Sequence, residues 1–250
     1  MKYIFLHIPK NGGTTLQRLV DDQYPSRNIY NIPDHEREQR LLELERKSNF
    51  RKRFIKVVKG GHFAFGCHRF FKDPEQVRYF AMLRDPYTRA YSYYRYVMRT
   101  PIHYLHAVFS SESITFDDFL ERGDLNMEIC NGQTKLLAGV EQREECTEET
   151  FALAKSHLAQ SFFLVGIMER YEETLYLLKE QLDWKRPIRY QRLNVSNDAK
   201  TALTDLQKEK IRALNRFDFE IYDKALKDFD QLLAGVPPAQ FETFLQSLES

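Results

Sequence analysis

The chain begins with a short apolar segment that leads into a glycine pair and then into a helical pattern. Residues 3–8 are almost uninterruptedly apolar and end at Pro9, which is typical of a buried strand in a parallel sheet. After Gly12 and Gly13, residues 14–20 carry apolar side chains at helical spacing. The order strand, glycine turn, helix is the first half of a βαβ unit, so it restricts the chain to folds with parallel strands.

Strand-like and helix-like segments alternate through the rest of the sequence. Further strands are expected at 54–58, 77–83 and 162–165, and helical patterns cover 86–99, 116–158, 169–182 and 200–233. This alternation predicts an α/β fold, a P-loop-like three-layer domain with a central, mainly parallel sheet flanked by helices. We expect a single domain over residues 1–235 and a short C-terminal helical tail over 236–250, after Pro237 and Pro238.

Positive and negative charges are nearly equal in number over the whole chain, but they are unevenly distributed in residues 34–53. In 250 residues, 37 Lys and Arg stand against 36 Asp and Glu. This balance argues against a protein that coats a polyanion with one basic face, so no nucleic-acid partner is expected. Residues 34–53 are acidic first and basic afterwards. We interpret them as a solvated helix; the alternative is a basic edge facing the substrate, with the stretch 46–59 as a track for a polyanionic acceptor.

The cysteines and the N-terminus indicate a cytoplasmic protein. Cys67, Cys130 and Cys146 are too few and too scattered for a disulfide framework or a zinc knuckle. The first apolar run is shorter than a signal-peptide core, and no stretch approaches the roughly 20 apolar residues of a membrane span. We therefore expect reduced thiols, no metal site and no membrane insertion.

The first loop with unusual chemistry follows the first strand. It contains Lys10, Asn11, Gly12, Gly13, Thr14 and Thr15. Glycines let backbone amides approach an anion closely, and the following helix N-terminus adds unpaired N–H groups. A Walker A loop places Gly-Lys-Ser/Thr at its end, whereas here the lysine precedes the glycines. The loop therefore suits a phosphate-like group in another geometry; the alternative is a tight turn with a surface lysine.

A second loop follows the strand at 77–83. Arg84 stands at the strand end, Asp85 and Pro86 begin a helix, and Ser92 lies two turns into it. An arginine fork and a serine hydroxyl in this arrangement can converge on one phosphate. The alternative is an ion-paired helix cap.

These segments resemble a known family. HIPKNGGTTL is similar to the 5′-phosphosulfate-binding loop of sulfotransferases, and LRDPYTRAYSYY to their 3′-phosphate-binding strand and helix. GHFAFGCH resembles a segment of the heparan sulfate 2-O- and 6-O-sulfotransferases and their bacterial relatives. NGQTKLLAG, VGIMERYEETLYLL, RLNVSN and FDFEIYDKAL resemble later blocks, so the similarity runs from about Lys2 to Leu226.

The resemblance implies transfer of a sulfuryl group from 3′-phosphoadenosine 5′-phosphosulfate (PAPS), without a metal, to an acceptor hydroxyl or, less favoured, an amine. By this resemblance Lys10, Asn11, Gly12, Gly13, Thr14 and Thr15 hold the 5′-phosphosulfate, and Arg84 and Ser92 hold the 3′-phosphate. Lys10 would also stabilise the leaving oxygen. The acceptor is a glycan or a small natural product. The alternatives are a variant P-loop kinase or NTPase and an inactive nucleotide-binding module of the same fold.

The acceptor hydroxyl loses a proton during attack, which calls for a general base. His62 matches the Gly-His pattern of the 2-O-sulfating relatives and His68 the pattern of the 6-O-sulfating ones, so both remain candidates. His62 is slightly favoured because it directly follows a predicted strand and Gly60-Gly61. His7, within the first strand, is expected to be a packed core residue.

Other polar residues are weaker candidates. Asn131 and Gln133 either contact a ligand or cap a helix, and Asn194 or Ser196 would belong to a nucleotide loop. The tyrosines between 87 and 96 are expected in the core and on an amphipathic rim, with one face able to stack on a flat acceptor.

Overall fold

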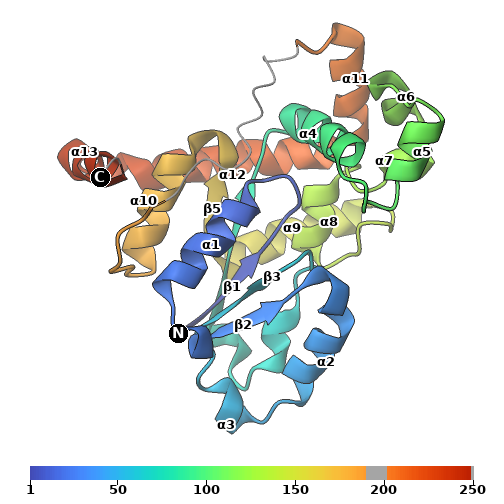
Figure 1. Ribbon diagram of the computed structural model, residues 1–250. Coiled ribbons are helices and arrows are strands. Elements are labelled where there is room, and N and C mark those ends of the chain that lie inside the picture. The colour runs from blue at the N-terminus through green and yellow to red at the C-terminus, as the bar shows by residue number, and fades with distance from the viewer. Residues whose placement is uncertain (190–201, 249–250) are drawn as a thin grey trace.

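A computed structural model describes residues 1–189 and 202–248 and contains a five-stranded parallel sheet. The strands are β1 (Lys2–Leu6), β2 (Ile29–Ile32), β3 (Val57–Gly60), β4 (Val77–Leu83) and β5 (Phe162–Ile167), in the order β2-β3-β1-β4-β5. Every neighbouring pair is parallel (Figure 1). The predicted α/β fold with a central parallel sheet is confirmed.

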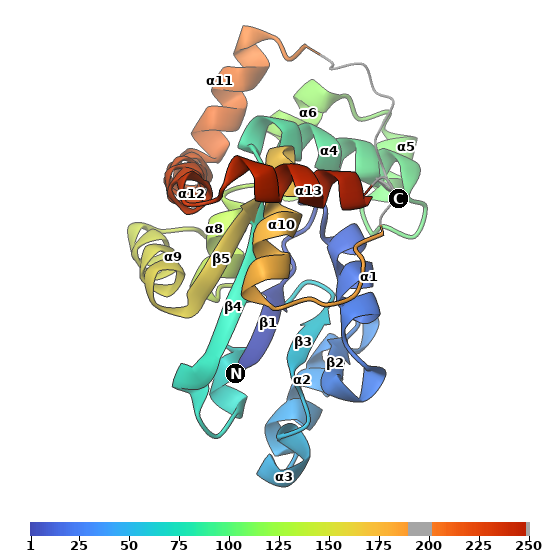
Figure 2. The same ribbon diagram turned by 90° about the vertical axis from the view of Figure 1, so that its left-hand side faces the viewer.

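Helices cover both faces of this sheet, which gives the expected three layers. The α-helices of the described residues are α1 (Gly13–Gln23), α2 (Arg37–Arg46), α3 (Asn49–Lys52), α4 (Pro86–Arg99), α5 (His106–Ser111), α6 (Phe116–Glu121), α7 (Gly123–Asn126), α8 (Gly132–Ala138), α9 (Glu148–Ser161), α10 (Tyr171–Gln181), α11 (Asp205–Leu214), α12 (Arg216–Ala234) and α13 (Pro238–Leu248). Figure 2 shows α1 and α10 on one side of the sheet and α8 and α9 on the other.

Burial on both faces of the sheet explains why the strand sequences are continuous apolar runs. Residues 79–83 of β4 are all at most 2% exposed, because both faces of the strand are covered by helices. A second apolar cluster joins α4 to α5, α6, α7 and α11 and includes Tyr93 and Phe119. Tyr93 is thus a core residue, as expected for part of the tyrosine group on α4.

Several sequence predictions need correction at their edges. Strand β3 begins at Val57 rather than at residue 54, and Phe54 is exposed. The charged region 34–53 is not one helix, since the chain turns between α2 and α3 at Lys47 and Ser48. The short strand β2 was not predicted from the sequence, because its four residues include Asn31 and carry no clear period.

The C-terminal helix packs on the rest of the protein. Phe241 and Phe244 of α13 contact the ring of Tyr176 on α10, and Phe244 is buried. Within the described part of the chain, we find no helix of the length and apolarity that crossing a bilayer requires.

Candidate active site

The strand order places two predicted loops next to each other. Strand β1 pairs with β3 on one side and with β4 on the other. The chain leaving β1 leads through α1 to β2, whereas the chain leaving β4 leads through α4–α9 to β5 on the opposite side. A crevice forms at the carboxyl ends of strands where connections diverge in this way, and ligands bind there in open α/β sheets.

The loop after β1 has a backbone that depends on glycine. Lys10 and Gly12 both have positive φ, 70° and 76°. A side chain at Gly12 would also stand 2.4 Å from Sδ of Met168, and one at Gly13 would collide with the ring of His7. The loop therefore runs close against the residues that directly follow β5 and β1, and α1 begins directly after it at Gly13.

A buried amide, Gln133 of α8, ties the two loops together. Its Oε1 accepts hydrogen bonds from Nδ2 of Asn11 (2.7 Å) and from the backbone N–H of Arg84 (3.0 Å), and its Nε2 donates to the carbonyl of Arg84 (3.0 Å). Asn11 also donates to the carbonyl of Met82. Both side chains are at most 1% exposed. The Asn11 side chain therefore holds the loop from inside the protein and does not line the cavity described below.

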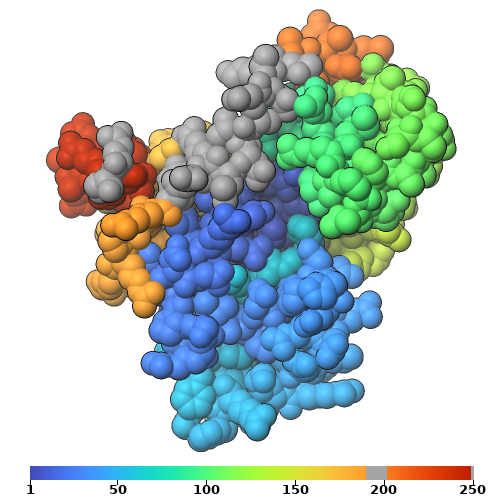
Figure 3. Space-filling model, viewed as in Figure 1, coloured from blue at the N-terminus to red at the C-terminus, as the bar shows by residue number. Residues whose placement is uncertain are grey.

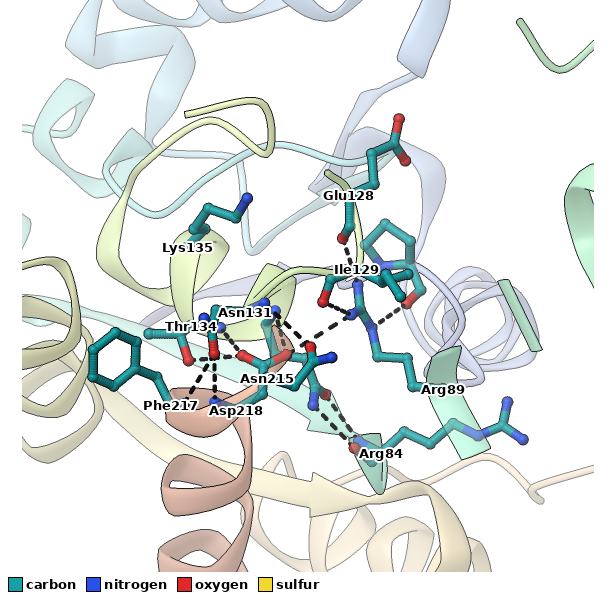
Figure 4. Close-up of polar contacts among 12 residues, drawn as sticks. Arg84, Arg89, Glu128, Ile129, Asn131, Thr134, Lys135, Asn215, Phe217 and Asp218 are labelled. Carbon is teal, nitrogen blue, oxygen red and sulfur yellow. Dashed lines mark hydrogen bonds and ion pairs between the residues drawn. The ribbon is translucent and has the colours of Figure 1, made fainter. Parts of the chain in front are cut away.

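A buried polar cluster around Arg89 and Asp218 holds the segments on which the two loops and Gln133 lie (Figure 4). Arg89 is 1% exposed and donates to the carbonyls of Pro9, Glu128 and Ile129, and its Nη1 lies 3.8 Å from Oδ2 of Asp218. Arg89 thereby fixes the residue before Lys10.

Asp218 of α12 is fully buried at the start of α8. It accepts hydrogen bonds from the backbone N–H groups of Gln133 and Thr134 and from Oγ1 of Thr134. A carboxylate at a helix N-terminus satisfies donors that the helix leaves unpaired. Asn131 has φ of 46° and accepts from the backbone N–H groups of Phe217 and Asp218. Asn131 therefore caps α12, which is one of the two roles weighed for it, whereas the Gln133 side chain caps no helix and joins the two loops.

A cavity of about 1200 Å³ opens beside the first loop. The described residues that line it come from the loop after β1, from α1, α2 and α4, from the ends of β2 and β3 and the residues that follow them, and from the segments around α5, α7 and α8. They include His7, Lys10, Thr14, Gln17, Asp34, Arg37, Gly60, Gly61, His62, Tyr93, Tyr96, His103, Tyr104, Glu128 and Arg143. Lys10 and His62, predicted from distant parts of the sequence, thus share one cavity.

The side chain of Lys10 is partly buried beside an aromatic ring and near three arginines. Its Nζ lies 4.1 Å from the centroid of the Tyr96 ring. Burial, with smaller contributions from Arg99, Arg84 and Arg89, lowers the pKa of Lys10 to about 8. An anion bound here would offset both effects, so this position favours a negatively charged ligand.

His62 is held by a carboxylate that the sequence analysis did not single out. Its Nδ1 lies 3.2 Å from Oδ1 of Asp34, and its backbone N–H donates to the same oxygen at 2.6 Å. The hydrogen bond from the His62 ring is the main cause that lowers the pKa of Asp34 to about 2. With Nδ1 occupied, Nε2 is the ring nitrogen of His62 left to exchange a proton.

His7 is buried but is more than a core residue, which corrects the sequence prediction. Its ring centroid lies 4.7 Å from that of His62, and it lines the cavity. Nδ1 lies within hydrogen-bond distance of the Gly60 carbonyl (3.1 Å) and of Nε2 of Gln17 (2.9 Å). Burial, followed by the proximity of His62, lowers the pKa of His7 to about 3, so the ring is neutral near pH 7.

The structure does not bring His68 to this cavity. Its Nδ1 lies 2.9 Å from the Tyr79 hydroxyl, and its ring packs at 4.8 Å from that of Phe65. Six residues beyond His62, the chain has already turned into a short helix, Cys67–Phe70, that packs beside β4. The two histidines left open by the sequence are therefore distinguished by position, and His62 is the one that lines the same cavity as Lys10.

The second loop is placed beside the first, but its predicted anion contacts are not seen directly. Nη1 of Arg84 donates to the carbonyl of Lys10 (3.0 Å), and Nε donates to Oγ1 of Thr88. Ser92 is half-buried on α4. Convergence of Arg84 and Ser92 on one phosphate stays a prediction, as do the roles of Thr14, which lines the cavity, and of Thr15, which is buried.

Two further predictions, the nucleotide loop around Asn194 and Ser196 and the metal-free reaction, are not tested by the structure. Asn194 and Ser196 lie outside the described residues. Among residues 1–189 and 202–248, no group of three or more His, Cys, Asp or Glu side chains is placed to hold a metal ion. The expectation of a metal-free reaction stays a prediction.

Comparisons with known proteins give structural neighbours only. No protein-family model and no curated protein matches the sequence. Among solved structures, a sulfotransferase from Alicyclobacillus acidocaldarius is similar with a TM-score of 0.48 and 17% identity, over 87% of this chain and 92% of that one. The mouse sulfotransferase SULT7A1, complexed with PAP, is similar with a TM-score of 0.43 and 15% identity, over 87% of this chain and 64% of that one.

Proposed function

We propose that this protein is a sulfotransferase that moves a sulfuryl group from PAPS to a hydroxyl, or less favourably an amine, of a glycan or small molecule. One observation carries the proposal: Lys10, at the glycine loop, and His62, held by Asp34, line the same cavity at the carboxyl ends of β1 and β3. An anion-binding loop and a proton acceptor are the two components that such a transfer needs.

The donor's phosphosulfate fits the loop after β1. The first turn of α1 contains no acidic residue, so its unpaired N–H groups and the positive end of the helix are available to an anion. Burial and neighbouring arginines lower the pKa of Lys10, and a bound anion would offset both effects. We assign the 5′-phosphosulfate to Lys10, Gly12, Gly13, Thr14 and the α1 N-terminus, and the 3′-phosphate to Arg84 and Ser92.

The proposed reaction is a displacement at sulfur. The acceptor oxygen forms a bond to sulfur while the bond from sulfur to the bridging phosphate oxygen breaks. Nε2 of His62 takes the acceptor proton, and Asp34 holds the ring through Nδ1 and stabilises the imidazolium that forms. Nζ of Lys10 donates to the bridging oxygen as negative charge develops on it.

The cavity wall beyond Lys10 also restricts the acceptor. Among the described lining residues it carries four carboxylates and two guanidinium groups, and both guanidinium groups are engaged: Arg37 pairs with Glu141, and Arg143 lies over the Tyr104 ring. Glu128 accepts a hydrogen bond from the Tyr104 hydroxyl (2.9 Å). The lining carboxylates are Asp34, Glu38, Glu128 and Glu141. Like charges repel, so we propose an uncharged or amine-bearing acceptor rather than a polyanionic glycan.

The loop after β1 lacks the lysine that a P-loop kinase or NTPase uses to contact nucleotide phosphates. The helix after the glycines begins Gly13-Thr14-Thr15, without the lysine that contacts nucleotide phosphates in a Walker A loop. An inactive binding module of the same fold differs from the proposed enzyme only in turnover.

The test is calorimetric titration with 3′-phosphoadenosine 5′-phosphate (PAP) in EDTA, beside ATP with magnesium. We expect metal-free PAP binding that Arg84→Ala weakens by about 1.5–3 kcal/mol, the usual contribution of a hydrogen bond to a charged group. Arg78→Ala, at the other end of β4, is the matched control and should bind normally. Absence of PAP binding, with magnesium-dependent ATP binding, would overturn the proposal.

Turnover separates the enzyme from the inactive module. Labelled PAPS is offered with neutral, amine-bearing and uronate-bearing oligosaccharides. Transfer to either of the first two classes supports the proposal. PAP binding without transfer to any class favours the inactive module, and transfer to the uronate class alone contradicts the acceptor assignment.

A further inference from the structure

A strongly basic segment lies far from the candidate active site. Residues 46–59 contain seven Lys or Arg and no Asp or Glu. Lys52 is buried, and Lys59 is buried and pairs with Asp21, so neither is free to meet a partner. Arg46, Arg51, Arg53 and Lys56 are exposed. They precede β3, whose other end, Gly60, reaches the cavity, so the alternative of a substrate-facing basic edge is not supported.

Two large aromatic side chains are exposed among these cations. Phe50 is 63% exposed and Phe54 is 47% exposed, and their rings meet edge to face with centroids 5.9 Å apart. The Arg53 guanidinium lies 3.8 Å from the Phe50 ring centroid and 4.6 Å from that of Phe54. We call Arg46, Phe50, Arg51, Arg53, Phe54 and Lys56 the α3 corner. Figures 1 and 3 show this part of the chain at one end of the molecule, away from α4.

A small basic hollow adjoins the α3 corner. Its volume is about 230 Å³, and Arg53 and Lys56 belong to its wall together with Lys2, Lys52 and Lys72. Asp73 is the only carboxylate among its described lining residues. Burial, and then the charge of Lys56, lowers the pKa of Lys2, as expected where cations crowd. Nζ of Lys2 and Nζ of Lys52 donate to backbone carbonyls, so the exposed Arg53, Lys56 and Lys72 are the cations of this hollow that can meet a phosphate group.

We propose that the α3 corner docks on the surface of an anionic phospholipid bilayer. Phe50 and Phe54 would enter the boundary between headgroups and acyl chains, and the surrounding cations would meet the lipid phosphates, one of them in the basic hollow. Exposed aromatic rings next to Lys and Arg are the combination that interfacial membrane binding uses. Each cation near an anionic membrane surface contributes about a fivefold gain in binding.

A bilayer fits these features better than a nucleic acid does. Single-stranded nucleic acids bind by stacking bases on free aromatic faces. Arg53 already lies over the rings of both Phe50 and Phe54, and the two rings meet edge to face, which occupies a further ring face. The neighbouring exposed carboxylates Glu45, Asp73 and Glu75 leave the basic character of the corner intact.

Docking by the α3 corner would leave the candidate active site open. Lys2, at the start of β1, lines the basic hollow, whereas His7, just beyond the end of β1, lines the cavity. The two sites thus lie at opposite ends of the same strand. The proposal is independent of the sulfotransferase proposal, because membrane binding can be measured without donor or acceptor.

The test is co-sedimentation of the full chain with vesicles of phosphatidylcholine alone and of phosphatidylcholine mixed with phosphatidylserine. We expect binding to the mixed vesicles only, decreasing as salt is added. The double variant Arg51→Glu/Lys56→Glu should lower the partition coefficient by roughly tenfold or more, because two cations are lost. Phe50→Ser/Phe54→Ser should also lower it, while Lys227→Glu and Leu206→Ser, at other exposed positions, should not.

Circular dichroism and thermal unfolding check that each variant is folded. Equal binding to both kinds of vesicle, no binding to either at low salt, or binding unchanged in both double variants would each overturn the proposal. A protein that does not bind vesicles but binds polyuridylate, and whose double variants lose that binding, would also overturn the proposal.

Discussion

Asp34 and His62, 28 residues apart in sequence, form a hydrogen-bonded pair in which one carboxylate oxygen lies 3.2 Å from the imidazole Nδ1 and 2.6 Å from the backbone nitrogen. The pair joins the end of β2 to the end of β3 through a polar contact at the cavity wall. With a pKa of about 2, the Asp34 carboxylate stays ionised at any pH near neutrality. It can therefore orient His62 and stabilise its protonated form during turnover.

We expect His62→Asn to lower kcat by a factor on the order of 10²–10⁴, the usual contribution of a general base. His68→Asn is the matched control and should leave kcat almost unchanged, because His68 packs against Tyr79 away from the cavity. Asp34→Asn should give a smaller loss than His62→Asn, since an amide oxygen still accepts from Nδ1 and only the charge is lost. Steady-state sulfuryl transfer measures all three, and a larger effect at His68 would reverse the assignment.

Anion binding should change the protonation of Lys10. Its pKa is lowered to about 8, chiefly by burial, and a bound phosphate would raise it again. Titration with PAP near pH 8 should therefore take up protons from the buffer. Calorimetry in two buffers of different ionisation enthalpy measures this uptake, which should disappear in Lys10→Met. Equal uptake by both proteins would place the titrating group elsewhere.

Loss of the Gln133 side chain should weaken both the fold and the donor site. Gln133→Ala leaves the Asn11 amide and the backbone N–H and carbonyl of Arg84 without their buried partner. Each unsatisfied buried group costs about 1–3 kcal/mol, so a clear fall in unfolding free energy is expected by urea titration. PAP affinity should fall as well, because the two loops lose their link. Gln160→Ala, at an exposed position on α9, is the control and should do neither.

His7 should make stability depend on pH. Burial holds its pKa in the folded protein at about 3, below the ordinary value of 6.5 for histidine. Between these values the unfolded chain binds a proton that the folded one excludes, so stability is full above 6.5 and falls as pH decreases toward 3. The loss is about 2 kcal/mol between pH 7.5 and pH 5, following 1.36 kcal/mol per pKa unit.

Urea titration of the wild type and of His7→Asn at those two pH values measures this effect. The variant should show a smaller loss of stability on acidification, even if it is less stable at both values. The same pH dependence in both proteins would exclude His7 as its source.

The local parts of the fold could be predicted from the sequence because they depend on short-range patterns. Strand β4 and helix α4 begin and end at the predicted residues, since an apolar run and a Pro86 start signal are both local. The glycine loop and its lysine were likewise recognisable, because a strand, a turn and a helix follow one another there without a break. Strand β2 could not be predicted, since it is short and its pairing with β3 supplies the stability that its own residues lack.

The sequence by itself therefore determined the α/β class, the two loops and the presence of Lys10, Arg84 and two candidate histidines. Only the tertiary structure decided that His62 and not His68 lines the cavity with Lys10, that Asp34 holds His62, and that Gln133 joins the two loops. The physical reason is that these contacts join residues far apart in the chain. Their distances depend on strand order and on the path of each loop, and neither of these has a periodic signature in the sequence.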